Sequence, residues 1–340
     1  MHTNKPNALP RLAAGLLAVA GALTLAGQAA ADYPERRIDA VVPWGAGGST
    51  DNMARSLTPH VEALLGTDIV INNRPGGTGV IGTSVVLSRP ANGYSLLYGA
   101  ENAQLYPILE LADFDYGALH PVSLIGQGIV LIVAPTGKAW DDFGDMLAEA
   151  QARPGELRMG DAGAGGLPST VLAMLNAVDE LDVRSVTFGG DGPAITALIG
   201  GHLDFMPMAL ASAQEQIRAG HLKALAVLST EPVEQLPDVP LITEFLPEME
   251  TFLPWGPFWG AYVHPNTPDA IKATLESAYA KAIAQEEFQA FLTRNGASSL
   301  NLQGEEAEEF LARWQSVTAW AMEGAGSAKV SPETLGIPRP

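Results

Sequence analysis

Apolar positions between residues 38 and 263 alternate between short continuous runs and longer stretches with helical spacing. The short runs are rich in β-branched residues and are bounded by turn residues, which is typical of buried strands. They predict strands at Ile38–Trp44, Asp68–Asn73, Tyr94–Gly99, Val122–Val133, Leu157–Gly160, Val183–Phe188, Leu203–Ala209, Leu222–Ser229 and Trp259–Val263. The stretches between them predict helices at Asp51–Leu65, Gly79–Ser88, Trp140–Ala152, Ser169–Val178, Pro193–Gly200 and Ser212–Ala219. This alternation predicts an α/β fold in which mainly parallel sheets are flanked by helices.

The C-terminal third has a different pattern, with three helical stretches and little strand between them. These helices are predicted at Pro268–Ala284, Glu286–Asn295 and Gly304–Met322. Pro59 falls inside the first predicted helix of the chain, where a proline is expected to kink the helix or end a turn.

Two apolar runs are long enough to begin in one sheet and end in another, at Val122–Pro135 and Pro257–Pro265. Two such crossing strands would make the first domain discontinuous. We therefore predict one domain from residues 32–130 plus 257–340 and a second from residues 131–256, with a ligand cleft between them. A chain of 340 residues is long enough for two domains.

The N-terminus has the composition of an export signal. Lys5 and Arg11 precede an uncharged stretch from Leu12 to Ala26, and Ala29–Ala31 offers a cleavage site before Asp32. The apolar run is shorter than the roughly 20 residues that a membrane span needs, although an uncleaved anchor is the alternative. We predict residues 1–31 as a signal peptide and the periplasm as the location.

Charge and cysteine content exclude several classes of function. The formal net charge is −19, and loss of Lys5 and Arg11 with the signal would make it −21. Such an acidic chain is unsuited to nucleic acids or to anionic membrane surfaces. The absence of cysteine excludes disulfides, thiolate metal sites and a lipid-anchored N-terminal cysteine.

Glycine-rich turns follow four of the predicted strands, at Gly45–Gly48, Gly76–Gly82, Gly163–Gly166 and Gly189–Gly192. In the first turn, Ser49, Thr50 and Asp51 are all residues that favour a helix start. The first N–H groups of a helix have no partner within the helix and can face an anion, although a plain strand–turn–helix link has the same pattern. One helix end stabilises an anion by up to ~2 kcal/mol, so several ends would have to converge.

The segment Gly77–Gly82 also matches the G-x-G-x-x-G pattern of dinucleotide-binding enzymes, with Glu101 at the place of a ribose ligand. Arg74 and Pro75 separate the strand from these glycines, whereas the dinucleotide turn follows its strand directly. The predicted export also places the chain where nicotinamide cofactors are not expected. A cofactor-dependent enzyme therefore stays an alternative reading.

Catalytic and metal-binding patterns are weak in this chain. The six histidines lack metal-ligand spacing, and no G-x-S-x-G nucleophile motif occurs. Trp44 lies inside the first glycine turn, and Trp255 and Phe258 lie where the second crossing strand would pass between the domains. Aromatic side chains at such places line ligand clefts or fill the core.

Six segments in register resemble the periplasmic solute receptors of tripartite tricarboxylate transporters, the Bug family. They are Ile38–Arg55, Val70–Gly82, Asn92–Leu97, Pro121–Gly126, Gly189–Asp204 and Leu236–Pro240, the last reading L-P-D-V-P. The resemblance implies a two-domain, type II-like periplasmic binding protein that closes on an organic acid and delivers it to membrane transporter subunits. It implies a monomer without cofactor, bound metal or catalytic residues.

Carried onto this sequence, the family's ligand loops imply three groups of binding residues. They are Trp44, Ala46, Gly47, Gly48, Ser49 and Asp51; Gly163, Ala164, Gly165 and Ser169; and Phe188, Gly189, Gly190 and Asp191, with Trp255 and Phe258 added as cleft walls. The chain has Ser169 where the family often has His, and Phe188-Gly189 where a Tyr-Lys pair is common. The first loop has Trp44-Gly45 where Phe-Pro is commoner. The missing cation and the added indole suggest a different ligand, such as a bulkier or less charged acid. A sensor that passes closure to a signalling partner is the alternative to transport.

Overall fold

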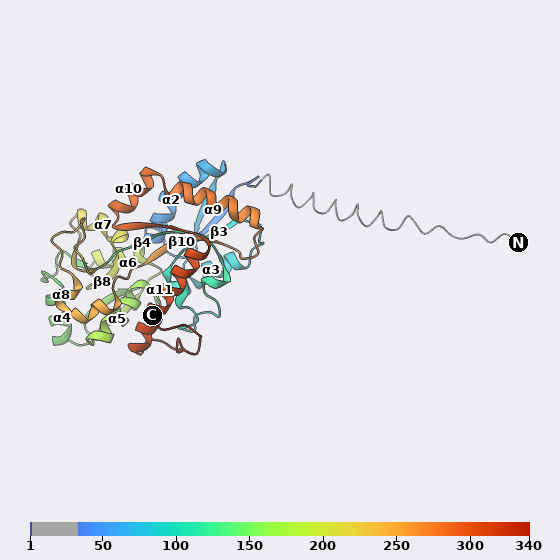
Figure 1. The fold of residues 1–340 in the computed structure, drawn as a ribbon. Helices are drawn as coiled ribbons and strands as arrows, with labels where there is room; N and C mark the ends of the chain where they lie inside the picture. The colour runs from blue at the N-terminus through green and yellow to red at the C-terminus, as the bar shows by residue number, and fades with distance from the viewer. Residues whose placement is uncertain (2–32) are drawn as a thin grey trace.

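A six-stranded sheet forms the first of two lobes in the computed structural model, which describes Met1 and residues 33–340 (Figure 1). The predicted signal peptide, residues 1–31, lies almost wholly outside the described residues. The strand order is β11-β4-β10-β3-β1-β2. The strands are β1 (Ile38–Val42), β2 (Ile69–Asn73), β3 (Ser95–Ala100), β4 (His120–Gly128), β10 (Phe258–Val263) and β11 (Ala297–Leu302).

Helices cover both faces of this sheet because its strands are apolar on both sides. Ile38, Ala40 and Val42 of β1 belong to one buried cluster, whereas Val41 belongs to another. The first cluster packs against α2 (Ser49–Leu65), α9 (Asp269–Ile283) and α10 (Glu286–Arg294), and the second against α3 (Val80–Leu87) and α11 (Gly304–Gly324). The alternation of faces follows from the two-residue period of a strand.

The second lobe contains two smaller sheets. Strand β5 (Val130–Pro135) pairs antiparallel with β8 (Met206–Ala209) and β9 (Leu222–Leu228). Strand β6 (Arg158–Asp161) pairs parallel with β7 (Arg184–Thr187). The helices of this lobe are α4 (Phe143–Ala152), α5 (Leu167–Val178), α6 (Asp191–Ile199), α7 (Leu210–Arg218) and α8 (Ile242–Phe245).

The two lobes are joined at a narrow place where two segments touch. Only Ile129 separates β4 of the first sheet from β5 of the second, so the first long apolar run crosses between sheets as predicted. The chain returns just before β10, and the N–H of Gly128 donates to the carbonyl of Pro257 at 2.8 Å. A Cβ on Gly256 would lie 2.1 Å from the carbonyl oxygen of Gly128, so only glycine allows this approach.

The strand pairing differs from the prediction of mainly parallel sheets. Among the strands of residues 33–340, β1–β2, β1–β3 and β6–β7 pair parallel, while β10–β3, β10–β4, β11–β4, β5–β8 and β5–β9 pair antiparallel. Strand β10 pairs with β3 and β4 alone, so the second predicted crossing strand does not itself cross between sheets. Strand β11 lies in the region predicted as helical, and α2 runs from Ser49 to Leu65 through Pro59 without a break.

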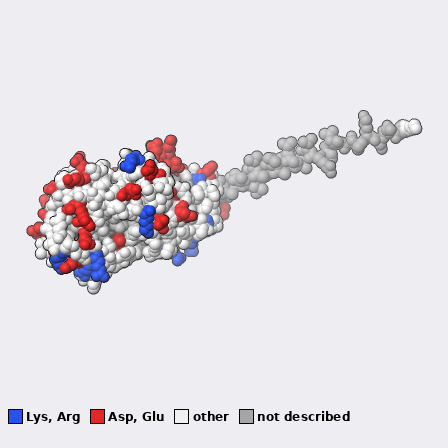
Figure 2. Space-filling model, turned by 90° about the horizontal axis from the view of Figure 1, so that it is seen from below, with Lys and Arg blue, Asp and Glu red and all other residues white. Residues whose placement is uncertain are grey.

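The surface of the described chain carries more acidic than basic side chains. Figure 2 shows acidic groups spread over one face, interspersed with a few basic ones. No helix among the described residues is long and apolar enough to span a membrane.

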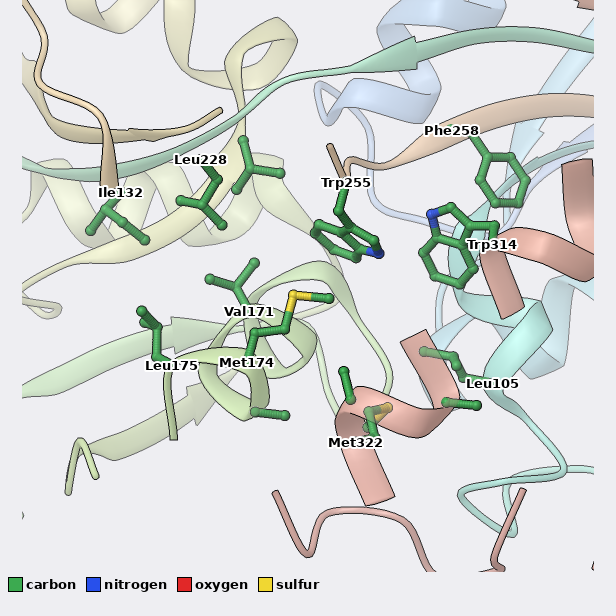
Figure 3. Close-up of a cluster of buried hydrophobic side chains, with 14 of the residues drawn as sticks. Leu105, Ile132, Val171, Met174, Leu175, Leu228, Trp255, Phe258, Trp314 and Met322 are labelled. Atoms are coloured by element: carbon green, nitrogen blue, oxygen red, sulfur yellow. The ribbon is translucent and has the colours of Figure 1, made fainter. Parts of the chain in front are cut away.

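A continuous hydrophobic core reaches from one lobe into the other. Figure 3 shows Trp255 beside Trp314, with Phe258 next to them and Val171 and Met174 of α5 on the other side. The ring centroids of the two tryptophans are 5.8 Å apart. Both indole N–H groups are satisfied, the one of Trp255 by the Thr318 hydroxyl and the one of Trp314 by the carbonyl of Gly256. This core fixes the segment that returns from the second lobe.

A buried carboxylate fixes the edge of the second lobe. Asp204 accepts hydrogen bonds from the backbone N–H and guanidinium of Arg158 and from Lys138, at 2.6–3.0 Å. Burial acts to raise the pKa of Asp204, but these hydrogen bonds outweigh it and hold the pKa well below its ordinary value. The folded state is therefore stabilised by the ionised form.

We expect Asp204→Asn to lower the free energy of unfolding by about 2 kcal/mol at neutral pH. Because the folded pKa is depressed, the stabilisation is complete above about pH 4, the ordinary Asp range, and is lost as the pH falls further. Urea unfolding at pH 7 and pH 3 should therefore show a gap between wild type and variant that narrows in acid. An equal gap at both values would show that ionisation of Asp204 is unimportant.

Candidate functional site

Three helices from the two lobes begin at one cavity. The residues that line it are Trp44, Gly48, Ser49, Thr50, Ala100, Glu101, Ala162, Leu167, Pro168, Gly190, Asp191 and Pro257. Helix α2 contributes its first turn from the first lobe, and α5 and α6 contribute theirs from the second. The N-caps of these helices are Gly48, Gly166 and Gly190, and none has a side chain that caps the first turn. Three positive helix ends therefore meet around one space.

Each helix begins here because a short glycine-rich turn follows a strand. The turn after β1 leads into α2, the turn after β6 into α5, and the turn after β7 into α6. Gly47 has a φ of +80° and Gly190 a φ of +129°, conformations in which a side chain would be strained. The turns thus bring helix ends to the carboxyl edges of their strands, where α/β proteins bind ligands.

The turns of the two lobes touch each other directly. The N–H of Gly45 donates to the carbonyl of Gly189 across the lobes at 2.8 Å. A Cβ on Gly192 would lie 2.1 Å from the carbonyl oxygen of Ala46. The structure therefore shows the two lobes in contact along this edge of the cavity.

Two carboxylates hold the shape of these turns from within. Asp51 accepts from the N–H of Gly47 and from the side chains of Arg55 and Asn73, all within 3.0 Å. Burial acts to raise the pKa of Asp51, and these hydrogen bonds outweigh it, so the pKa lies below its ordinary value. Asp161 accepts from the N–H of Ala162 at 2.8 Å, and burial raises its pKa. Asp51 thus uses a backbone donor, the N–H of Gly47, that the sequence assigned to a ligand.

Asp191 reaches from the second lobe to the first turn of α2. Its carboxylate accepts from the Ser212 hydroxyl at 2.5 Å. Burial raises the pKa of Asp191, and interactions with Ser212 and Ser49 offset part of that rise. A carboxyl group of the second lobe therefore lies beside the start of α2, where a Cβ on Gly48 would be 3.6 Å from the Cβ of Asp191.

Glu101 is the second acid of the cavity, placed directly after β3. Glu101 is buried, with 5% of its surface exposed to solvent. Burial raises the pKa of Glu101 to about 8, and the charge of Asp191 adds to the rise. The carboxyl is therefore protonated at neutral pH. The sequence pattern predicted Glu101 only as a ribose ligand, although an acid directly after the mostly apolar run of β3 was the available signal.

The structure brings part of the predicted site together. Trp44, Gly48, Ser49, Gly190 and Asp191 line the cavity, while Ala46, Gly47, Asp51, Phe188 and Gly189 belong to the turns that form it. Lining residues that the prediction did not name are Thr50, Ala100, Glu101, Ala162, Leu167, Pro168 and Pro257.

Other predicted site residues lie elsewhere. Gly163 and Gly165 face the first lobe, where a Cβ would lie 2.6 Å from Thr78 and Leu109 respectively. Ala164 between them is exposed, and the Ser169 hydroxyl donates to the carbonyls of Gly163 and Gly166.

The structure places Trp255 and Phe258 in the core instead of in the cavity (Figure 3). Their indole and phenyl rings pack on Trp314, which the pattern near the crossing did not reveal.

The dinucleotide-like segment is used for packing. Gly77–Gly79 forms a single 3₁₀ turn, and the carbonyl of Thr78 within it accepts from Tyr106. A Cβ on Gly79 would lie 2.8 Å from the Tyr106 hydroxyl, and one on Gly82 would lie 2.8 Å from Pro43. These glycines face protein atoms and leave no room at this turn for a pyrophosphate.

Comparison with known proteins agrees with this architecture. The tripartite tricarboxylate transporter family receptor matches residues 53–318. The chain is 34% identical to BugT of Bordetella pertussis, over 62% of this chain and 66% of BugT.

Solved structures support the same conclusion. The periplasmic binding protein BugD is 25% identical with a TM-score of 0.78, covering 91% of this chain and 100% of BugD. MatC from Rhodopseudomonas palustris, solved with bound malate, is 26% identical with a TM-score of 0.77, covering 86% of this chain and 100% of MatC. The predicted two-domain fold class is confirmed by these relatives. The chain belongs to the tripartite tricarboxylate transporter receptor family, whose members are periplasmic solute-binding proteins and not enzymes.

Proposed function

We propose that this protein captures a small organic acid in the cavity between its lobes and delivers it, in the periplasm, to a tripartite tricarboxylate-type membrane transporter. The observation that carries the proposal is the convergence of α2, α5 and α6, with their glycine N-caps, on one cavity. MatC, which belongs to the same fold and was solved with malate, supports a carboxylate as the ligand class.

Helix ends suit a carboxylate because their N–H groups point at the ligand and their dipoles favour negative charge. Each end contributes roughly 0.3–1 kcal/mol when exposed and up to about 2 kcal/mol when partly buried, so several ends together give useful affinity. Trp44 adds an indole wall at the same cavity, which favours a ligand with an apolar or aromatic part.

Capture would work by closure of the lobes. Ligand contacts to both lobes stabilise the closed arrangement relative to an open one. We propose that residues 32–130 plus 257–340 move as one domain and residues 131–256 as the other, about Ile129 and the segment before Pro257. Both walls of the cavity come from one chain, so we propose that the monomer is the binding unit.

A thermal-shift screen tests the proposed function. Mono-, di- and tricarboxylates, aromatic acids and the matching amides should be compared, with calorimetry on the acids that raise the melting temperature. We expect at least one acid to bind saturably and its uncharged amide to bind more weakly. A chain that responds to no carboxylate, or that binds NAD saturably instead, would contradict the proposal.

We expect Gly192→Ala to weaken the binding of that acid by about tenfold or more. The added Cβ would collide with the carbonyl of Ala46, and the lobes can relieve the collision only by separating. The melting temperature without ligand should change little, because the collision is between lobes and not within one.

Gly137→Ala is the matched control, since a Cβ there meets no atom within 4 Å. Calorimetry gives the affinities and small-angle scattering the separation of the lobes. An unchanged dissociation constant for Gly192→Ala would show that this contact is not needed for capture.

We expect affinity for the acid to fall about tenfold between pH 7 and pH 9, because the Glu101 carboxyl ionises with a pKa of about 8. The titratable groups around it are Asp191, whose pKa burial also raises, and Tyr106, Tyr116 and Tyr262, whose raised pKa values keep them neutral. Glu101→Gln should remove the pH dependence. If the affinity of Glu101→Gln still falls between pH 7 and pH 9, a group other than Glu101 causes the pH dependence.

A further inference from the structure

The cavity contains two acids of the protein and no base. None of the described residues that line it is Lys or Arg, whereas Glu101 and Asp191 both face it. Glu101 is buried, with 5% exposure, and Asp191 is half-buried. An anionic ligand therefore meets positive helix ends on some sides and carboxyl groups on others.

Asp191 lies beside the first turn of α2. A Cβ on Gly48 would lie 3.6 Å from the Cβ of Asp191, so the two turns are in van der Waals contact. Ser49 of the first lobe is close enough to the Asp191 carboxyl to lower its pKa. A ligand carboxylate that met the start of α2 would therefore lie next to a carboxyl group of the chain.

The backbone donors left for a ligand lie in the first turns of the three helices. In the lining, the N–H groups of Thr50, Leu167 and Asp191 lie in the first turns of α2, α5 and α6, and within residues 33–340 none of them has a carboxylate partner. These donors can hold the two oxygens of one carboxylate. A second carboxylate on the same ligand would lie near Asp191, and none of the described lining residues is a cation that would offset the repulsion.

We propose that Asp191, with no cation beside it, restricts this cavity to small acids with a single carboxylate, whose other end is neutral or carries a protonated nitrogen. The inference rests on the proposed function and narrows its ligand class. Asp191 acts as a specificity-determining residue, because it lies beside the start of α2 and repels a second negative group. Glu101, which is protonated at neutral pH, adds no charge to the cavity.

Two matched ligand series test this inference. The first is propionate with its third carbon bearing hydrogen, carboxylate, amide or ammonium: propionate, succinate, succinamate and β-alanine. The second is benzoate with the same choices at the far end: benzoate, terephthalate, terephthalamate and 4-(aminomethyl)benzoate, included because of Trp44. In whichever of the two series binds, we expect the amide or the ammonium compound to bind about tenfold tighter than the dicarboxylate of the same series.

Asp191→Asn keeps the shape of the side chain and removes its charge. In this variant, the dissociation constant of the dicarboxylate, measured by calorimetry, should come within about twofold of that of the matching amide. Asp141→Asn is the matched control, because it removes one charge from an exposed side chain of the same lobe and should leave the ratio unchanged. Circular dichroism and the melting temperature confirm that each variant is folded.

The outcomes separate the two proposals. A wild-type protein that binds the dicarboxylate as tightly as its partners overturns the inference and leaves the proposed function standing. The inference is also overturned if the ratio of the dissociation constants for the dicarboxylate and its amide partner is the same in Asp191→Asn, Asp141→Asn and wild type. If no carboxylate of either series or of the screen binds, the proposed function fails and the inference fails with it.

Discussion

The approach of Asp191 to the first turn of α2 is the contact on which the closed arrangement depends. It joins a helix start of the second lobe to a helix start of the first, through Ser49, at the wall of the cavity. Close to it, Gly45 and Gly189 share a backbone hydrogen bond, and Gly192 lies against Ala46. Backbone can approach backbone this closely only where Cβ atoms are missing, so the glycines of the two turns are a condition for the contact.

Elements away from the cavity hold the two lobes in position for this contact. The nearly continuous strands β4 and β5 carry the chain from one sheet to the other, and the core around Trp255 and Trp314 holds the returning segment. The joining region is therefore stiff on its core side, while the contact at the cavity consists of a few hydrogen bonds and glycine approaches. A small set of interactions at the cavity can thus shift the balance between open and closed lobes.

The acidic character of the chain is compatible with an acidic ligand. The formal net charge of the chain is −19. Surface carboxylates further than ~8 Å from the ligand are largely screened at physiological salt. Glu101 and Asp191 line the cavity and lie too close to its contents for such screening. In the proposed function, their placement, and not the total charge, sets which anions the cavity accepts.

Local sequence determined the elements and the turns of this protein. The period of apolar residues identifies nearly every strand and helix, and glycine followed by Ser, Thr or Asp marks the start of α2, because these patterns reflect short-range backbone preferences. Only the tertiary structure decided that β10 and β11 pair antiparallel with β4, that Trp255 and Phe258 fill the core, and that Glu101 joins Asp191 at the cavity. These outcomes depend on which segments, distant in the sequence, meet in the fold. The local sequence around an indole or an acid is the same whether the side chain faces a core or a cleft, so it could not predict them.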